Sequence, residues 1–373
     1  MSIKAILSVR DGDMLGTLRR FLADLLEQGV VDALLVPLEG PGGVGIAPAL
    51  VVDPAQLERA NPVAPAMPVN AAVLVSALTR REPGARIGAV LRPCEIRALI
   101  ELVKLNQAHL DPLTIIGVDC LGTYEVTDYV RLVQAGGHPT AELLAQAPEG
   151  DLTSLDAAPF RAACQMCEFP LPAHADIAIG LLGVEVGRGI LVELPEELAE
   201  RLGLTPTEAD RRQGVVENLI AARIKKRDAV FAEVGERIQD LPGLLAQFAT
   251  CIRCYNCTVA CPLCYCKECL FRTPTFDHES DQYLRWAERK GAIRMPVDTL
   301  LFQLTRMNHM AVACVGCGMC ESACPSDLPL TAIFRAVGSR VQALFDYQAG
   351  RSLEEELPLT TFKEEELVEL GGH

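Results

Sequence analysis

The sequence has few aromatic and few basic residues. Aromatic side chains make up 5% of its 373 residues, one of them is a tryptophan, and 34 Lys and Arg stand against 49 Asp and Glu. The formal charge of −15 argues against a nucleic-acid-binding protein or a DNA-binding regulator, because contacts to phosphate depend on clustered Lys and Arg. An acidic surface is instead typical of a protein that stays dispersed and docks against a chosen partner.

Targeting and membrane segments are also missing. The start of the chain has no apolar core of signal-peptide length before Arg10 and Asp11. A membrane-spanning helix would need a charge-free stretch of about 18 residues, and the sequence contains none. We therefore expect a cytoplasmic protein with no membrane-spanning helix.

Cysteine, by contrast, is abundant. The chain has 15 cysteines, and a reducing cytoplasm keeps thiols open, so a disulfide framework is not expected. Metal binding is the simplest explanation for so many thiols, and their spacing can test it.

The first half of the chain alternates apolar strand-like runs with amphipathic helical patterns. This alternation predicts an α/β domain at residues 1–194 with a largely parallel or mixed sheet. A glycine-rich piece at 40–45 could bind phosphate, but Pro41 and the absence of a helical pattern after it favour a hairpin turn. The predicted strands cover residues 4–9, 33–38, 86–91 and 113–118, and the predicted helices cover 16–29 and 95–106.

A helical connector is predicted at residues 195–250, with one helix opening at Pro195 and another at 205–208. Its basic residues predict a solvated helix face, and a docking patch for an acidic partner or a phosphate is the alternative. These residues are Arg211, Arg212, Arg223, Lys225, Lys226 and Arg227.

The rest of the chain is predicted to be mostly helical. A ferredoxin-type domain is expected at residues 251–335, with helices at 281–290 and 297–309 between two groups of cysteines. Residues 336–373 form an acidic tail.

Two matched cysteine motifs give the strongest signal in the sequence. Each has three cysteines spaced by two residues and a fourth Cys-Pro after three more, a pattern that binds 4Fe–4S clusters in two-cluster ferredoxins. The fourth cysteine of each motif there ligates the other cluster. Zinc is the alternative, but its sites do not need this doubled arrangement. The predicted ligands are Cys251, Cys254, Cys257 and Cys324 for one cluster, and Cys314, Cys317, Cys320 and Cys261 for the second.

Four further cysteines lie in the first domain. Cys94 and Cys120 each follow a predicted strand, and Cys164 and Cys167 form a chelating pair. Because the ends of parallel strands meet at one edge of a sheet, the four could hold a third cluster. Alternatively, Cys94 and Cys120 are buried small apolar residues.

The helical insert between the two motifs resembles the α-helical ferredoxin layout of succinate-dehydrogenase-like and heterodisulfide-reductase-like proteins. Four further motifs lie in the first domain, namely Pro93-Cys94-Glu95, Ile116-Gly117-Val118-Asp119-Cys120, Cys164-Gln165-Met166-Cys167 and Ala175-Asp176-Ile177-Ala178-Ile179-Gly180. With these motifs, residues 70–195 resemble the beta-subunit family of deazaflavin-reducing hydrogenases and formate dehydrogenases. The run 261–269 is similar to the ferredoxin part of the formate dehydrogenase branch. The resemblance implies that the four cysteines of the first domain hold a 4Fe–4S cluster beside a FAD.

The resemblance also implies flavin contacts. The family's N-terminal glycine-rich Thr motif appears here only as Asp11-Gly12-Asp13-Met14-Leu15-Gly16-Thr17. Each candidate has another reading, with Thr17 and Asn70 as helix caps and Arg92 as a surface cation. The FAD candidates by position are Thr17, Asn70, Arg92 and Gly183.

Three thiols remain outside these sets, namely Cys264, Cys266 and Cys269. They are either spare thiols or part of a fourth metal site, which Asp277, His278 or a residue of a partner could complete. The sequence singles out no catalytic residue.

These features predict an electron-transfer oxidoreductase subunit. FAD would exchange hydride with a soluble carrier, either a deazaflavin or NAD(P)H, and the clusters would connect it to a partner. The resemblance implies a formate dehydrogenase, hydrogenase or heterodisulfide-reductase-like partner. The alternative is a flavin-free iron–sulfur relay within such a complex.

Iron, sulfide and flavin measured on anaerobically purified protein test this prediction. Three clusters with four irons each correspond to about twelve irons per chain, together with one FAD. A content of about eight irons without flavin would contradict the third cluster and the hydride chemistry.

Overall fold

The computed structural model describes residues 2–81, 84–111, 113–150, 152, 158–207, 212–276, 279–292, 298–358 and 360. The chain divides into two compact units. The α/β unit comprises Met1–Ala229, Val315–Gly318 and Gly350–Glu354. The helical unit comprises Val230–Cys314, Met319–Ala349 and Glu355–His373.

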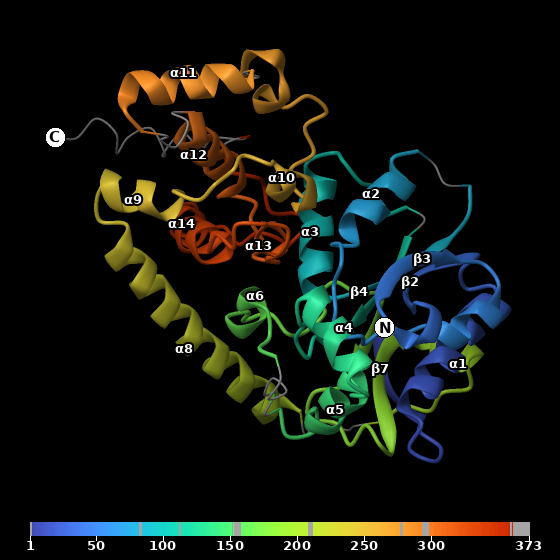
Figure 1. Ribbon diagram of the computed structural model, residues 1–373. Coiled ribbons are helices and arrows are strands. Elements are labelled where there is room, and N and C mark those ends of the chain that lie inside the picture. The colour runs from blue at the N-terminus through green and yellow to red at the C-terminus, as the bar shows by residue number, and fades with distance from the viewer. Residues whose placement is uncertain are drawn as a thin grey trace. The chain divides into compact units, whose positions relative to one another are not determined.

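A seven-stranded sheet forms the centre of the α/β unit (Figure 1). Its strands are β1 (Ser2–Ser8), β2 (Ala33–Glu39), β3 (Ile46–Val51), β4 (Ile87–Leu91), β5 (Leu113–Val118), β6 (Ile177–Gly180) and β7 (Gly189–Pro195). Their order is β1-β7-β6-β5-β4-β2-β3. The neighbours among β2, β4, β5 and β6 pair in parallel, whereas β3 and β7 pair antiparallel with β2 and β6, and β1 with β7. The predicted mixed sheet is confirmed.

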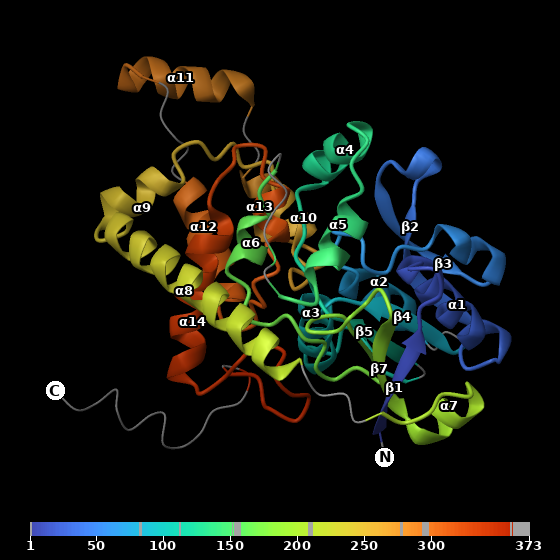
Figure 2. The ribbon, with the colours of Figure 1, turned by 90° about the horizontal axis from the view of Figure 1, so that it is seen from below.

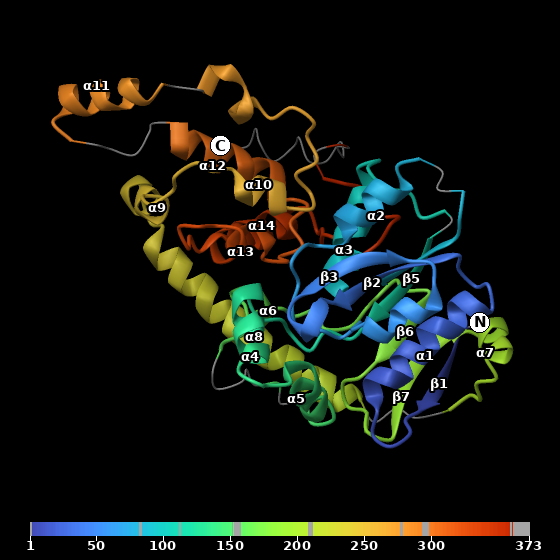
Figure 3. The same ribbon diagram turned by 45° about the vertical axis from the view of Figure 1, so that its right-hand side comes forward.

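Helices cover both faces of this sheet. They are α1 (Met14–Glu27), α2 (Ala72–Thr79), α3 (Pro93–Lys104), α4 (Val126–Gln134), α5 (Pro139–Gln146), α6 (Ala162–Gln165) and α7 (Glu196–Arg201), with a 3-10 turn, η2, at Pro54–Arg59. Ile116 and Val118 of β5 join the main core with Leu22 of α1. Gly117 between them faces α3, because a Cβ added there would lie 3.1 Å from Ile96 Cδ1. Figure 3 shows α2 and α3 on the opposite side of the sheet from α1.

The glycine-rich piece at 40–45 connects the two strands of a hairpin, as predicted. β2 and β3 pair antiparallel over six residue pairs, ending at Glu39 and Ile46. The short 3-10 turn η1 (Pro41–Gly43) lies between them. Gly42 and Gly43 have φ of 71° and 74°, which glycine adopts without steric cost.

The long helix α8 (Gln213–Arg237) begins later than predicted (Figure 2). Pro206 forms an antiparallel bridge with Ala5, and the Thr207 N–H donates to the Lys4 carbonyl at 2.8 Å. The chain therefore continues strand pairing where a helix start was predicted. Residues 208–211, including Arg211, lie outside the described residues.

The prediction that the basic residues of this segment face solvent is wrong for three of them. Arg212 donates to Asp119 Oδ2 at 2.7 Å, Arg227 pairs with Glu168 at 3.1 Å, and Arg223 is buried with 7% exposure. The charge pattern could not reveal these contacts, because their acceptors come from distant parts of the chain. The exposed members are Lys225 and Lys226.

The helical unit holds the shorter helices of the C-terminal half. They are α9 (Leu241–Gln247), α10 (Asn256–Ala260), α11 (Ser280–Lys290), α12 (Asp298–Met310), α13 (Met319–Ser322) and α14 (Leu330–Leu344), with 3-10 turns η3 (Leu270–Arg272) and η4 (Pro274–Phe276). The predicted helices at 281–290 and 297–309 correspond to α11 and α12. Phe302 of α12 lies edge-on to Tyr255 and Phe271, with centroid distances of 5.1 and 5.2 Å. Across the described residues, no helix is long and apolar enough to cross a membrane. Glu364–Glu366 of the acidic tail lie outside the described residues.

The core position of α1 gives a test of this fold. Leu22 is fully buried in the main core, whereas Leu26, one turn later, is only partly buried against it. We expect Leu22→Ala to lower the free energy of unfolding by about 3 kcal/mol, because a cavity remains where the side chain was. Leu26→Ala is the matched control and should cost about 1 kcal/mol. Urea unfolding of the anaerobic protein followed by circular dichroism measures both, and equal losses would contradict this packing.

Candidate iron–sulfur centres

Four cysteines of the α/β unit gather at the carboxyl edge of the sheet. Cys94 is the second residue of α3, directly after β4, and Cys120 follows β5, the parallel neighbour of β4. Burial raises the pKa of the Cys94 thiol, and the charges of Glu95, Cys120, Cys317 and Cys167 raise it further. Strand ends from separate parts of the sequence therefore bring these thiols together.

Cys120 connects this group to Cys164. The pKa of the Cys120 thiol is raised to about 12. Burial is the largest cause, the charges of Cys164 and Cys167 raise the pKa further, and Arg92 and Arg223 lower it. Each of the four cysteines thus lies close enough to at least one of the others for their charges to interact. The site also holds cations that would offset several thiolates, so its donors suit an anionic cluster.

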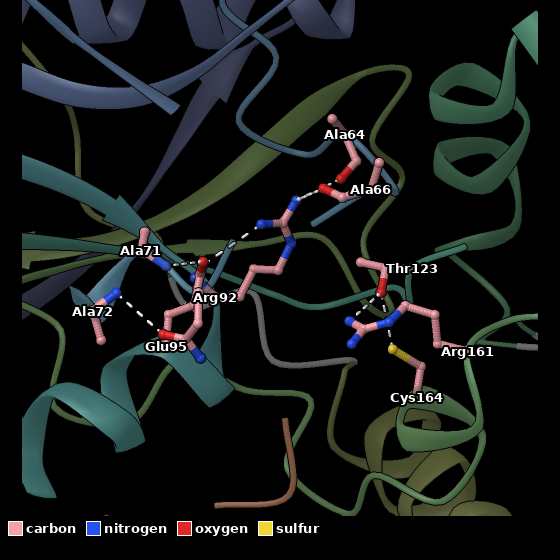
Figure 4. A network of polar contacts seen from close by, with 10 residues as sticks. Ala64, Ala66, Ala71, Ala72, Arg92, Glu95, Thr123, Arg161 and Cys164 are labelled. Carbon is pink, nitrogen blue, oxygen red and sulfur yellow. Dashed lines mark hydrogen bonds and ion pairs between the residues drawn. The ribbon is translucent and has the colours of Figure 1, made fainter. Parts of the chain in front are cut away.

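Hydrogen bonds fix the chain around the Cys164–Cys167 pair. The Thr123 hydroxyl lies 3.1 Å from Cys164 Sγ (Figure 4), and Cys167 Sγ lies 3.8 Å from the Phe169 carbonyl oxygen. Arg223 Nη1 donates to the Cys167 carbonyl at 3.5 Å. The basic residues of α8 therefore help to build this site.

One loop of the second cysteine motif belongs to the same unit. Val315–Gly318 groups with the α/β unit, and buried arginines hold it there. Arg161 Nη2 donates to the Cys317 carbonyl at 3.1 Å, and Arg97 Nη1 donates to the Val315 carbonyl at 3.0 Å. Cys317 therefore lies beside the four cysteines of the sheet edge.

In the helical unit, parts of both cysteine motifs come together. Helices α10 and α13, which carry Cys257 and Cys320, are neighbours. The pKa of the Cys257 thiol is raised to about 11. Burial is the largest cause, Arg306 lowers the pKa, and the charges of Cys320, Cys251 and Cys254 raise it. The pairing of Cys324 with the first motif stays a prediction.

A buried arginine lies among these thiols. Arg306 is 5% exposed, donates to the Cys257 carbonyl at 3.3 Å and stacks 4.3 Å from the Phe334 ring centre. Burial acts to lower its pKa, but the charges of Cys320, Cys257 and Cys261 raise it overall. Its Nε and Nη1 atoms are buried without a hydrogen-bond partner. Buried N–H groups without partners are rare, and here they suit an anionic, sulfide-bridged cluster.

The three remaining thiols also lie close together. Burial raises the pKa of the Cys264 thiol, Arg306 opposes this, and the charges of Cys266 and Cys269 add to it. The proposed completing ligands, at positions 277 and 278, lie outside the described residues. Within the described part of the chain, no three His, Cys, Asp or Glu side chains are grouped to hold a single metal ion. The cysteines of a 4Fe–4S cluster bind separate iron atoms.

Two of the flavin candidates lie together. Arg92 is 8% exposed, so the reading of a surface cation is wrong, and it donates to the Ala64 carbonyl at 2.6 Å (Figure 4). Glu95 accepts from the backbone N–H of both Arg92 and Ala71. Beside them Asn70 Oδ1 accepts from the Ala72 N–H just before the N-cap residue Ala71 of α2, and the buried Nδ2 of Asn70 has no partner.

The other two candidates lie elsewhere. Asp13, not Thr17, caps α1, and the Thr17 hydroxyl donates to the Asp13 carbonyl at 2.8 Å. Gly183 packs against Arg212. The α/β unit has cavities of about 480 Å³ beside Gly12 and Tyr129 and about 560 Å³ beside Arg212. Neither of these two is lined by any of the four candidates, whereas Arg92 lines a smaller cavity together with Ala71 and Glu95. The assignment of the four residues to a flavin site stays a prediction.

Several residues of these centres were not found in the sequence. Arg161, Gln303 and Arg306 fall in no motif, and single polar residues in helical patterns usually point to solvent. Gln303 Nε2 nevertheless donates to Cys251 Sγ at 3.4 Å. Only Arg161 carries a weak signal, since it lies three residues before Cys164.

Known proteins resemble this chain in the same regions. The 4Fe-4S dicluster domain family matches residues 247–328, which include both cysteine motifs. The F420-dependent formate dehydrogenase subunit beta of Methanocaldococcus jannaschii is 27% identical over 359 residues, covering 87% of this chain and 89% of that protein. F420-dependent formate dehydrogenase 1 subunit beta of Methanococcus maripaludis is 25% identical over 380 residues, covering 91% of each. A chain of the F420-reducing NiFe hydrogenase complex from Methanosarcina barkeri aligns with a TM-score of 0.45 and 14% identity, covering 65% of this chain and 94% of that one.

The chain thus has a 4Fe–4S dicluster domain, which places it in the class of iron–sulfur proteins. Within that class it is a relative of the beta subunits of F420-dependent formate dehydrogenases, and the family resemblance of its sequence is confirmed.

The contact between Gln303 and Cys251 can be tested directly. With Cys251 as a cluster ligand, Gln303→Leu removes an N–H that points at the ligand sulfur. Hydrogen bonds to sulfur favour the more negative reduced cluster, so its midpoint potential should fall by about 30–60 mV. Redox titration followed by electron paramagnetic resonance (EPR) measures the shift. Gln213→Leu makes the same change on the exposed face of α8 and should leave all potentials unchanged.

Proposed function

We propose that this chain passes electrons between a soluble hydride carrier and a partner redox subunit through three 4Fe–4S clusters. The observation that supports this most strongly is the gathering of four distant cysteines at the carboxyl edge of the sheet, with Cys317 of the dicluster domain beside them. A chain of clusters is useful only where it connects two sites of chemistry, so both ends need redox partners.

The ligand assignments belong to this proposal. A 4Fe–4S cluster, when bound, accepts and releases one electron at a time. The chain's own residues hold the thiolates in place, cover most of them at least in part, with Cys254 exposed, and offset their charge with arginines. The N-terminal cluster is held by Cys94, Cys120, Cys164 and Cys167, the first dicluster site by Cys251, Cys254, Cys257 and Cys324, and the second by Cys314, Cys317, Cys320 and Cys261.

A converter between hydride and single electrons is needed at the carrier end, and FAD is the usual one. The names of the relatives favour the deazaflavin F420 as carrier over NAD(P)H, and formate dehydrogenase as the partner enzyme. A hydrogenase or a heterodisulfide-reductase-like protein is the alternative partner. These specific identities rest on the relatives.

A flavin-free relay is the second candidate function, and one observation favours it. The family's glycine-rich Thr motif is present here only as the run from Asp11 to Thr17, and the Thr17 hydroxyl donates to the Asp13 carbonyl of its own helix start. In that case another subunit would supply the converter, and this chain would only carry single electrons.

Reduction by candidate carriers separates these functions. Anaerobic protein is mixed with reduced F420, NADH or NADPH, and cluster reduction is followed by absorbance and EPR. We expect reduced F420 to reduce the clusters of a flavin-containing preparation, whereas a relay would respond only to dithionite.

The Cys164→Ser variant tests the place of the N-terminal cluster. It should lose about four of about twelve irons, and reduced F420 should no longer reduce the dicluster sites while dithionite still does. Cys266→Ser changes an exposed thiol outside the three assigned sets and should keep its irons. Equal iron contents in Cys164→Ser and the unaltered protein would contradict the assignment.

A further inference from the structure

A single buried cation lies between two groups of cysteines in the α/β unit. Arg161 is 3% exposed and immediately precedes the short helix α6. Its Nη2 donates to the Cys317 carbonyl at 3.1 Å, and its Nη1 donates to the Thr123 hydroxyl at 3.4 Å. That hydroxyl in turn lies 3.1 Å from Cys164 Sγ (Figure 4). One guanidinium thus contacts both a ligand loop of the dicluster domain and the network at the N-terminal site.

The electrostatics of Arg161 agree with this geometry. Burial acts to lower its pKa, but the charges of Cys164, Glu125, Cys317 and Cys94 raise it overall. Glu125 lies 3.6 Å from Nε, and its side chain is 38% exposed, so solvent screens this carboxylate. The guanidinium charge therefore acts mainly on the cysteines of both groups.

We propose that Arg161 is a shared positioning residue that tunes two clusters, the N-terminal cluster and the cluster bound through Cys317, and that these two are consecutive in the electron path. The inference rests on the proposed function, whose ligand sets it uses. The step between them is the transfer of one electron, in which one cluster is oxidised and the other reduced. No bond forms or breaks, and no proton moves.

A fixed positive charge in a buried site favours the reduced, more negative form of each cluster. It also stays charged at every pH, because a guanidinium does not deprotonate in proteins. A hydrogen bond to the Cys317 carbonyl keeps this charge at a constant place relative to both sites. Arg161 would thus raise the midpoint potentials of both clusters together, so that electrons pass in either direction without a large difference in potential between them.

Three variants separate charge from anchoring. Arg161→Gln removes the charge, Arg161→Lys keeps it, and Arg97→Lys keeps a charge on α3 while removing the guanidinium that anchors the same loop at Val315. We expect Arg161→Gln to lower the midpoint potentials of both clusters by about 59 mV each, a tenfold change in the one-electron equilibrium. Arg161→Lys should shift them less, and Arg97→Lys should leave the N-terminal potential unchanged. EPR-monitored redox titration of the full chain measures all four proteins.

The outcomes are distinct. A shift confined to one cluster, or equal shifts in Arg161→Gln and Arg97→Lys, would overturn the shared role. About twelve irons in each variant would show that the ligand sets, and with them the proposed function, still hold.

The order of the clusters is tested without any change at Arg161, which covers the case in which Arg161→Gln loses iron. In the fully reduced protein, two neighbouring paramagnetic clusters should give an interaction spectrum. We expect the interaction of the N-terminal cluster to persist in Cys254→Ser, which alters the first motif, and to vanish in Cys164→Ser. Its loss in Cys254→Ser would place the first-motif cluster next in the path and overturn the inference.

Discussion

The pairing of buried thiols with buried arginines is the constraint on which the rest of this structure depends. The pKa of Cys120 is raised to about 12 and that of Cys257 to about 11, with burial as the largest cause in each case, so thiolates at these places are costly without nearby positive charge. Arg223 opposes the first rise and Arg306 the second. The cations must be buried themselves, and that is favourable only where several thiolates converge.

The fold brings cysteines together in each of the two units. The parallel strands β4 and β5 place Cys94 and Cys120 at one edge of the sheet, while α10 and α13 bring Cys257 and Cys320 together in the helical unit. Connections between the elements can vary in length without moving these points. The chain divides inside the second motif, and Val315–Gly318 belongs to the α/β unit.

The basic helix α8 shows how a charged face can take part in a site. Arg223 and Arg227 form carbonyl and ion-pair contacts near the four sheet-edge cysteines, whereas Lys225 and Lys226 are exposed. Arginine suits this role because its planar fork can bind two acceptors at once and cannot lose its charge. The difference between Arg and Lys along one helix thus follows from what each faces.

The sequence by itself determined the chemistry. The doubled cysteine motif implied two clusters from spacing alone, and the βα alternation implied the mixed sheet, because both patterns are local and periodic. Which cations surround the thiols was decided only by the tertiary structure. Arg161, Gln303 and Arg306 meet cysteines that are from three to more than a hundred positions away, and no local pattern records such contacts. The same holds for the flavin candidates, since motif positions do not show that the Thr17 hydroxyl donates to the Asp13 carbonyl or that Gly183 packs against Arg212. Spacing along the chain fixes which atoms can bind iron, but the field around that iron depends on long-range packing.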